Sequence, residues 1–489
     1  SASAREALHL ILNYLIGVTN GFGFYEGWNE GPGYGNSKMK WLMDATIYLD
    51  TAIREIDLGK NPYLRRIGAF FTCITPVGLQ HCSFGDMGSN EDSYLGNNIH
   101  NFRKLAYATG EGSFLKFWEE SQKRWIDKHG MKCPYFRPWI EYVLPYYYRR
   151  PKESFGKEVY SKFFKVAGWV MTNTHSPISY NAYKASVGMV FQCRPRGGYS
   201  HSYHSENSFL IHAYGEVITS GAAPTKWDVI SRLTMSHNTI LVDGLGQNPP
   251  RARGFLYPEG CSRYGYIDAW FRRPALVYWV GDATNAYHWK APYLKCFRRH
   301  VLFLGRKYFI IFDDLQVDPD HSPSTFQWLY HIKPEGDLTF NRDSFEFSYR
   351  VGENRVKVRH LSNLDNLSYE DRQRSEGLIN PVTGEDYRGE VETIQKRFGG
   401  FDLFQHNIWI ENHKPAHEFN FMTVIYPYKV GEPEPSIERI DDLTVKVGQR
   451  GLFDMVSFDV NTRLRPNILI DYKSLHRRNL CRRGANIVC

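Results

Sequence analysis

The sequence predicts an α+β, multidomain fold in which helices come first and a large antiparallel β-sandwich follows. Two observations predict it. Apolar residues recur at helical spacing up to about residue 165, and beyond that point the chain breaks into many short, β-branched and aromatic-rich segments with no helix between them. We therefore expect the C-terminal part of an incomplete α/α toroid over residues 1–165, an antiparallel β-sandwich over residues 166–430 and a small β-rich region over residues 431–489.

The helical part is predicted from three segments, at residues 4–18, 37–56 and 97–130, whose apolar residues fall on one helical face. Gly- and Pro-rich connectors separate them, as in helix pairs whose loops build a cleft at one end of a toroid. The first segment reads as the middle of a helix, so we expect further chain before residue 1. No apolar run reaches the length of a membrane span, and we expect no transmembrane helix.

The β part is predicted from short apolar segments bounded by Gly, Pro, Asp or Asn. They read GWVMTNT, VGMVFQC, NSFLIHAYG, HNTILVDG, ALVYWVGDA, RHVLFLGRKYFIIFDDL, TFQWLYHI, FEFSYRV and FNFMTVIYPY. Residues 361–398 are charged and polar, and we expect an insertion or a long loop there.

The charge and the aromatic content of the chain indicate which classes of molecule it could bind. The formal net charge of +8 favours polyanions, and aromatic residues at 15% suit sugar stacking as well as a large core. Apart from two Arg pairs near the C-terminus, no dense basic arm is present, so we expect no nucleic-acid partner. The eight cysteines form no CxxC pair, which argues against a zinc module or a dense disulfide framework.

Three segments carry residues suited to chemistry. GWNEGPGYG at 27–35 presents Trp28 and Tyr34 on a tight loop, although a helix–helix turn with a packed Trp fits equally well. GGYSHSYHSENSF at 197–209 places two histidines and a glutamate before a strand, as metal ligands, a general base or an accident of a surface loop. TMSHNTILVDGLGQ at 234–247 opens a strand with His237, a ligand or a hydrogen-bonded structural histidine.

Taken together, the motifs resemble a known family. The order of motifs is similar to that of the heparinase II/III-like polysaccharide lyases. It most resembles the branch of exolytic oligoalginate lyases and exolytic heparinases. The motifs, in chain order, are W-x-E-G-P-x-Y, SH…NSF, AYGE, HNTILVDG, GDAT-x-AY, RHVLFL…YFIIFDDL and WLYH. The resemblance covers roughly residues 10–350. It implies β-elimination: a base removes the C5 proton of a uronic acid, an acid protonates the departing C4 oxygen, and a neutraliser stabilises the carboxylate charge that develops.

The resemblance also implies residue roles. Tyr34 matches the family tyrosine that acts as base, acid or both, and positive neighbours must lower its pKa from the usual value near 10. His201 matches the sandwich histidine that binds the carboxylate or takes the proton. The expected substrate-binding residues are Trp28, Asn29, Glu30, His204 and Glu206.

Two departures from the family pattern concern a metal and the neutraliser. Of three expected zinc ligands, two fall on Tyr203 and Thr219, and only His237 is kept; we therefore expect either that His204 replaces a lost ligand beside His237 or that there is no structural zinc. The chemistry itself requires no cofactor. The family neutraliser lies upstream of the tyrosine loop, and GNNIH at 96–100 reads as an ordinary helix start.

The expected function is cleavage of an acidic polysaccharide of the heparin/heparan or alginate type, from a chain end, by a secreted or periplasmic protein. Three alternatives remain open. A uronate C5-epimerase would remove the same proton without expelling the leaving group. A glycoside hydrolase would need two facing carboxylates, which nothing in the sequence marks. A non-catalytic binding protein would use the same cleft without turnover.

Overall fold

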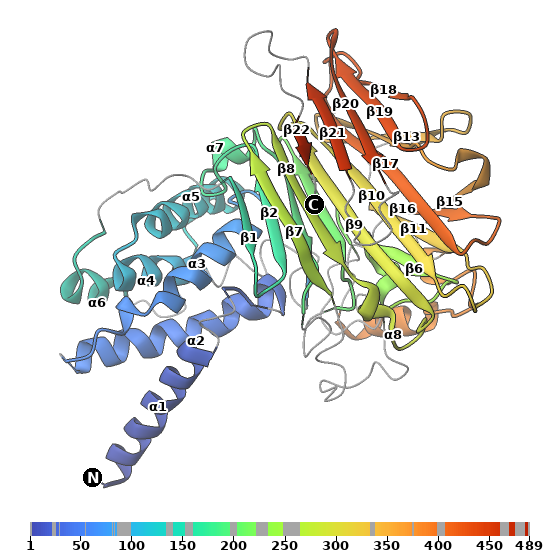
Figure 1. Ribbon diagram of the computed structural model, residues 1–489. Coiled ribbons are helices and arrows are strands. Elements are labelled where there is room, and N and C mark those ends of the chain that lie inside the picture. Colours follow the sequence, from blue (N-terminus) through green and yellow to red (C-terminus); the bar gives the residue numbers. More distant parts are fainter. Residues whose placement is uncertain are drawn as a thin grey trace.

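In a computed structural model, the structure describes residues 2–21, 26–28, 30–53, 55–80, 82, 84–85, 99–133, 140–151, 160–195, 203–221, 233–247, 265–332, 338–373, 376–398, 406–459, 469–474 and 485–487. Helices occupy the first third of the chain and antiparallel sheets nearly all the rest, as predicted (Figure 1). The domain boundaries drawn from the sequence remain predictions; the first strand begins at Ser161, ahead of the expected change near residue 166.

The helices of the first part include the three predicted segments, with two differences. The second helix begins at Gly31, inside the predicted loop 27–35, and helices at Pro62–Ile74 and Ile140–Tyr147 were not among the predicted segments. The helices are α1 (Ala2–Gly21), α2 (Gly31–Ala52), α3 (Pro62–Ile74), α4 (Ile99–Thr109), α5 (Gly112–His129) and α6 (Ile140–Tyr147); α7 (Tyr180–Tyr183) and α8 (Arg388–Phe398) lie among the strands. The segment 97–130, predicted as one helical stretch, is two helices. Gly110 separates them because its φ of +75° is left-handed and ends α4.

Four sheets follow, and all their strand pairings are antiparallel. The five-stranded sheet has the order β1 (Ser161–Phe164), β2 (Trp169–Asn173), β3 (Val187–Gln192), β4 (Ser208–Ala213) and β5 (Glu216–Thr219). The eight-stranded sheet has the order β12 (Thr339–Asn341), β13 (Glu346–Val351), β14 (Asn354–His360), β17 (Glu418–Lys429), β10 (Tyr308–Val317), β9 (Leu294–Leu304), β8 (Leu276–Asp282) and β7 (Tyr266–Arg273).

Two smaller sheets complete the β part. One has the order β15 (Leu367–Gln373), β16 (His406–Asn412), β11 (Phe326–Ile332) and β6 (Ile240–Val242). The other is C-terminal, with β18 (Ser436–Arg439), β19 (Thr444–Gln449), β20 (Leu452–Asp459), β21 (Leu469–Ser474) and β22 (Ala485–Ile487). The expectation of an insertion or loop over 361–398 is wrong in part, because this stretch contains β15 and α8.

The five-stranded sheet is buried on both faces, and this explains why its strands read as continuous apolar runs. Successive side chains of a strand point to opposite faces. Met189 and Phe191 of β3 pack in one core with the eight- and four-stranded sheets, whereas Val190 between them packs with the helices. β4 divides in the same way, with Phe209 on the first side and Leu210 on the second.

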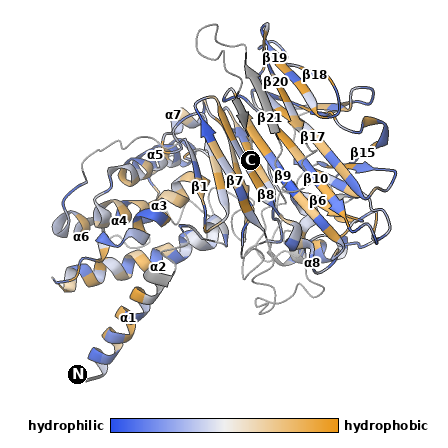
Figure 2. Cartoon of the chain, viewed as in Figure 1, coloured by the Kyte–Doolittle hydropathy of each residue, from blue (hydrophilic) through white to orange (hydrophobic). Residues whose placement is uncertain are grey.

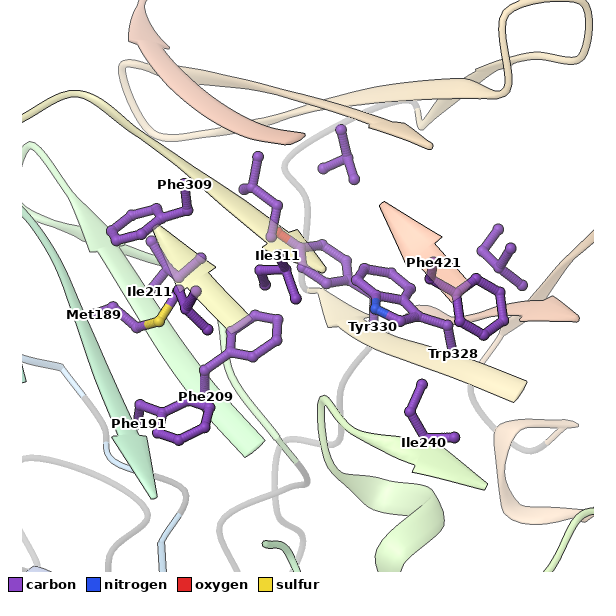
Figure 3. Packing of buried hydrophobic residues seen from close by; sticks show 14 of the residues in the cluster. Met189, Phe191, Phe209, Ile211, Ile240, Phe309, Ile311, Trp328, Tyr330 and Phe421 are labelled. Atoms are coloured by element: carbon purple, nitrogen blue, oxygen red, sulfur yellow. The ribbon is translucent and has the colours of Figure 1, made fainter. Parts of the chain in front are cut away.

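The eight-stranded sheet is also covered on both faces. One face shares the core drawn in Figure 3, where Phe309 and Ile311 of β10 lie near Ile211 of β4, with Trp328 and Tyr330 of β11 beyond them. The other face packs against the C-terminal sheet through residues such as Ile310 and Val445. The order of layers is therefore helices, five-stranded sheet, the two inner sheets and C-terminal sheet (Figure 1).

α1 differs from the other helices in its exposure. Figure 2 shows it extending away from the rest of the chain with apolar residues along its length. The side chains of Leu10 and Tyr14 are 66% and 71% exposed, while Leu15 is buried. None of the helices in the described residues combines the length and apolar character needed to span a bilayer.

Candidate active site

The tyrosine loop, residues 26–34, leads into the first turn of α2. Gly31 begins the helix with a φ of +79°, and a proline follows it in the first turn, where a missing N–H costs nothing. Trp28, Glu30 and Tyr34 are half-buried, and the indole Nε1 of Trp28 donates a hydrogen bond to Glu30 Oε2 at 2.8 Å. Asn29 lies outside the described residues. Trp28 and Glu30 thus lie on the loop as predicted, whereas Tyr34, which was also expected on the loop, lies in the first turn of α2.

Gly31 of this loop and Gly85, which faces it, are required by contacts with protein backbone. A Cβ on Gly31 would lie 1.7 Å from the carbonyl oxygen of Phe84, and a Cβ on Gly85 would lie 2.0 Å from the carbonyl oxygen of Glu30. Both glycines also have left-handed φ values. The close approach of the two backbones joins the loop to residues 84–85 and so fixes where α2 starts.

The loop also reaches the five-stranded sheet through a short series of contacts. A Cβ on Gly27 would lie 2.8 Å from Cβ of Ala167, in the turn between β1 and β2. The next residue, Gly168, accepts a hydrogen bond at its carbonyl from the N–H of Cys193, at 2.8 Å. Cys193 follows β3 directly, and its neighbour Arg194 binds the segment ahead of β4. The tyrosine loop and that segment therefore lie at the same end of the sheet.

That second segment, residues 203–207, is fixed by a buried ion pair. Glu206 and Arg194 are both fully buried, and Arg194 Nη2 lies 2.7 Å from Glu206 Oε1. Arg194 also donates a hydrogen bond from Nη2 to the carbonyl of Tyr203 at 2.6 Å. Both oxygens of the Glu206 carboxylate accept bonds from Arg194. This burial argues against the predicted contact of Glu206 with substrate and gives it a structural role.

A second buried group joins residues 203–207 to the strand entry at 237–239. The guanidinium of Arg299 donates from Nη1 to the carbonyls of Asn207 and Asn238, each at 2.7 Å. Its other nitrogens bind Asp313 at 2.6 and 2.9 Å. Desolvation raises the pKa of Asp313, and the Arg299 charge opposes that rise. Gln247 adds a bond in each direction between its side-chain amide and the backbone of Glu206.

Two of the histidines expected to bind substrate or metal, His204 and His237, are buried. His204 is 3% exposed and His237 is fully buried, with its ring centroid 5.5 Å from that of Tyr203. The hydroxyl of Thr219 donates to the carbonyl of His331 at 2.8 Å and accepts from Asn238 at 2.9 Å. Burial argues against a substrate contact of His204. His201 lies outside the described residues.

Among the described residues, the donor set for a structural zinc is incomplete. Zinc sites take three or four N, S or O ligands from His, Cys, Asp or Glu. Within the described part of the chain, no three such residues gather at one point. The expected ligand positions hold a tyrosine ring and a hydroxyl already bound to its neighbours. A zinc bound by His204 and His237 therefore stays a prediction, and no chemical step below uses it.

The GNNIH segment is consistent with the interpretation made from sequence. His100 lies in the first turn of α4, where Nε2 is 3.1 Å from the carbonyl oxygen of Cys133 and Nδ1 accepts from the Trp118 indole at 3.2 Å. One ring nitrogen thus contacts α5 and the other contacts the segment that follows it. Asn97 and Asn98 lie outside the described residues.

Sequence reasoning missed the buried framework around residues 203–207. Arg299 and Asp313 stand in the apolar strands RHVLFL and YFIIFDDL, and a charge inside such a run implies a buried partner. That signal could have paired these two residues. Nothing comparable marks Arg194 or Gln247, which lie in polar stretches.

Comparisons with known proteins show similarity to a family of heparinases. A family model described as heparinase II/III-like, C-terminal, matches residues 157–421. No curated protein matches the chain in sequence. Among solved structures, a heparinase III gene product has a TM-score of 0.60 at 14% identity over 88% of this chain and 58% of its own. Heparan sulfate lyase HepC from Pedobacter heparinus has a TM-score of 0.57 at 16% identity, over 88% and 58%.

The solved structures and the family model support different conclusions. The solved structures share the fold, and the chain spans about three fifths of the length of those it matches. The family model covers more than half of the 489 residues, including every described strand from β1 to β16. The chain therefore belongs to the heparinase II/III-like family.

Proposed function

We propose that this protein is a polysaccharide lyase that cleaves uronic-acid-containing glycosaminoglycans by β-elimination. The observation that carries the proposal is the family match over residues 157–421. The names of its structural neighbours, heparinase III and heparan sulfate lyase, support the glycosaminoglycan class. Alginate is the second substrate in order of preference, and release from a chain end is the proposed mode.

In this proposal Tyr34 exchanges protons with the substrate. Its phenol sits at the N-terminal end of α2, where the helix dipole favours negative charge by roughly 0.3–1 kcal/mol. Lys38, one helical turn further along and exposed, adds a positive charge on the same side of the helix. The phenolate is the form able to accept the C5 proton. These two effects favour it, and the carboxylate of Glu30, four residues before Tyr34, opposes it. Protonated again, the phenol can supply a proton to the C4 oxygen.

His201 is proposed to act from the other side of the sugar. Residues 203–207 begin two positions after His201 and are fixed by Arg194 and Arg299. They lie at the same end of the five-stranded sheet as the tyrosine loop. A segment so fixed limits where a side chain two residues away can reach. Trp28, Asn29 and Glu30 are proposed to contact the sugar ring and its hydroxyls, with Trp28 and Glu30 held by their mutual hydrogen bond.

The finer architecture belongs to the same proposal. The helices α1 to α6 would form part of an α/α toroid, and the five- and eight-stranded sheets would form the sandwich. Residues 1–165, 166–430 and 431–489 are the proposed domains. A secreted or periplasmic location goes with a polysaccharide substrate. The neutraliser of the carboxylate is not assigned to any described residue.

A substrate panel tests the proposal. Purified protein is incubated with heparin, heparan sulfate, chondroitin sulfate, hyaluronan and alginate, and the ultraviolet absorbance of the unsaturated uronate is followed. We expect the absorbance to rise with a glycosaminoglycan. New reducing ends without that absorbance would indicate hydrolysis, and exchange of solvent deuterium into C5 without cleavage would indicate epimerisation. Binding without any of these changes would identify a non-catalytic binding protein and overturn the proposal.

A further inference from the structure

Two neighbouring hairpin turns of the eight-stranded sheet carry a group of exposed cations. One turn joins β7 to β8 and the other joins β9 to β10. The turns are adjacent because Leu276 pairs with Leu304, and the N–H of Gly305 donates to the carbonyl of Ala275 at 2.9 Å. The four exposed cations, here called the basic turn surface, are Arg272, Arg273, Arg306 and Lys307.

The arginines of this surface are ordered by contacts that leave their charge exposed. The guanidinium of Arg306 lies 5.9 Å from the centroid of the Tyr160 ring, and its Nε donates to the carbonyl of Pro274 at 3.0 Å. The guanidinium of Arg273 lies 5.2 Å from the centroid of the Phe271 ring. Ordering on an aromatic face reduces the conformational entropy that a side chain loses when it binds a ligand.

Arg272 ties the same surface to the five-stranded sheet. Its Nη1 donates to the carbonyl of Ser161, the first residue of β1, at 3.1 Å. The other guanidinium nitrogens keep donors for an external anion. The basic turn surface therefore spans the meeting point of two sheets.

Within the described part of the chain, none of these four cations forms an ion pair with an acidic side chain. Across the described ranges, no carboxylate lies within 4.0 Å of any of the four, although exposed cations elsewhere, such as Arg350 and Lys396, have carboxylate partners. Among the described residues, the surface thus holds four cations without an ion-pair partner, in a chain whose formal net charge is +8. Such a concentration of one sign attracts polyanions.

We propose that the basic turn surface is a second binding site for a sulfated, acidic polysaccharide; this rests on the proposed function. A planar guanidinium matches sulfate and carboxylate oxygens with paired hydrogen bonds. The two nearby rings, Tyr160 and Phe271, already hold arginines, which disfavours the base stacking that single-stranded nucleic acid uses.

This surface is separate from the candidate active site. The N–H of Gly265, just before β7, donates to the carbonyl of Arg194 at 3.0 Å, so that end of β7 lies at the active-site end of the sheets. Arg273 ends the same strand, seven residues beyond Tyr266, which is roughly 23 Å along an extended strand. A long polysaccharide can occupy both places and gain avidity, whereas a short oligosaccharide occupies one.

The test uses two charge-matched double variants of the full chain. The first is Arg273→Gln with Lys307→Gln. The control is Arg342→Gln with Lys414→Gln, which removes two exposed cations away from the surface, Arg342 being beside β12 at the opposite edge of the eight-stranded sheet. Binding of fluorescent heparin, in polymeric and tetrasaccharide form, is measured at several salt concentrations, and thermal melting checks that both variants fold.

We expect the first variant to bind polymeric heparin about fivefold more weakly, as for two exposed ion pairs, and the control to match wild type. Tetrasaccharide cleavage should be unchanged in both. Equal weakening in both variants would show that binding follows net charge alone, and equal loss of binding to single-stranded DNA would show a site without preference for polysaccharide; either result overturns the proposal. Because binding is measured without turnover, a protein that binds but does not cleave refutes the proposed function and leaves this inference standing.

Discussion

The tyrosine loop and residues 203–207 lie at one end of the same sheet but are held by opposite means. The loop is half-buried and is positioned by close backbone contacts such as that of Gly31 with Phe84. Residues 203–207 are buried and are positioned by the guanidiniums of Arg194 and Arg299. The tyrosine loop (the glycine side) depends on the absence of a side chain at Gly31. Residues 203–207 (the charged side) depend on the charges of Arg194 and Arg299. The two should therefore fail under different perturbations.

The largest effect is expected from breaking the charged side. Arg299→Ala leaves the Asp313 carboxylate buried without its partner and two backbone carbonyls without a donor. We expect a loss of about 3–5 kcal/mol in the free energy of unfolding, measured by urea denaturation. The exposed control Arg342→Ala should stay within about 0.5 kcal/mol of wild type.

A double variant sharpens that result. Arg299→Met combined with Asp313→Leu removes both charges at once, and we expect it to recover much of the lost stability. It cannot restore the bonds to Asn207 and Asn238, so turnover should stay low while the protein folds. Wild-type turnover in a stable double variant would contradict the role given to Arg299.

The next effect tests the glycine side. Gly31→Ala places a Cβ 1.7 Å from the Phe84 carbonyl at a left-handed φ, whereas Gly110→Ala has a similar φ of +75° but meets no atom within 4 Å. We expect Gly110→Ala to cost about 1 kcal/mol in unfolding free energy, from backbone strain alone. Gly31→Ala should cost about 3 kcal/mol, since overpacking adds to the strain. Equal costs in urea denaturation would mean that the Phe84 contact is not rigid.

Acid should lower the free energy of unfolding through a buried histidine of β14 in the eight-stranded sheet. Burial lowers the pKa of His360 from 6.5 to about 3, and its Nδ1 meets only the Thr423 hydroxyl, at 3.0 Å. A histidine with a depressed native pKa takes up its proton first in the unfolded chain, so stability is full above pH 6.5 and falls as the pH drops toward 3. At pH 5 this histidine should cost on the order of 2 kcal/mol. The pH 7 to pH 5 loss of unfolding free energy should shrink by that amount in His360→Gln; an identical loss in both proteins would refute the assignment.

The smallest effect concerns the half-buried hydrogen bond of the loop. Glu30→Gln keeps an acceptor for the Trp28 indole but removes the charge. We expect less than about 1 kcal/mol of change in stability. The Michaelis constant for substrate should rise, because Glu30 is a proposed sugar contact. An unchanged Michaelis constant would limit Glu30 to a structural role.

Much of the fold could be predicted because periodicity is local. The short apolar runs of β3 and β10 are visible in the chain itself, and both were predicted as strands. What could not be predicted depends on distant partners. The burial of Glu206 follows from Arg194, twelve residues earlier and across a strand pair, and the need for Gly31 follows from Phe84. The positions of His201 and Asn29 stay outside the described residues, so their roles remain predictions.

The most direct measurement is turnover of Tyr34→Phe on the glycosaminoglycan that wild type cleaves best, together with its dissociation constant. Removing one hydroxyl from a half-buried ring should leave binding within about twofold of wild type and lower the rate of unsaturated product formation about a thousandfold, the loss expected for a proton-transfer group. A variant that still forms the unsaturated product at the wild-type rate would contradict the assignment of Tyr34 and the account of catalysis that depends on it.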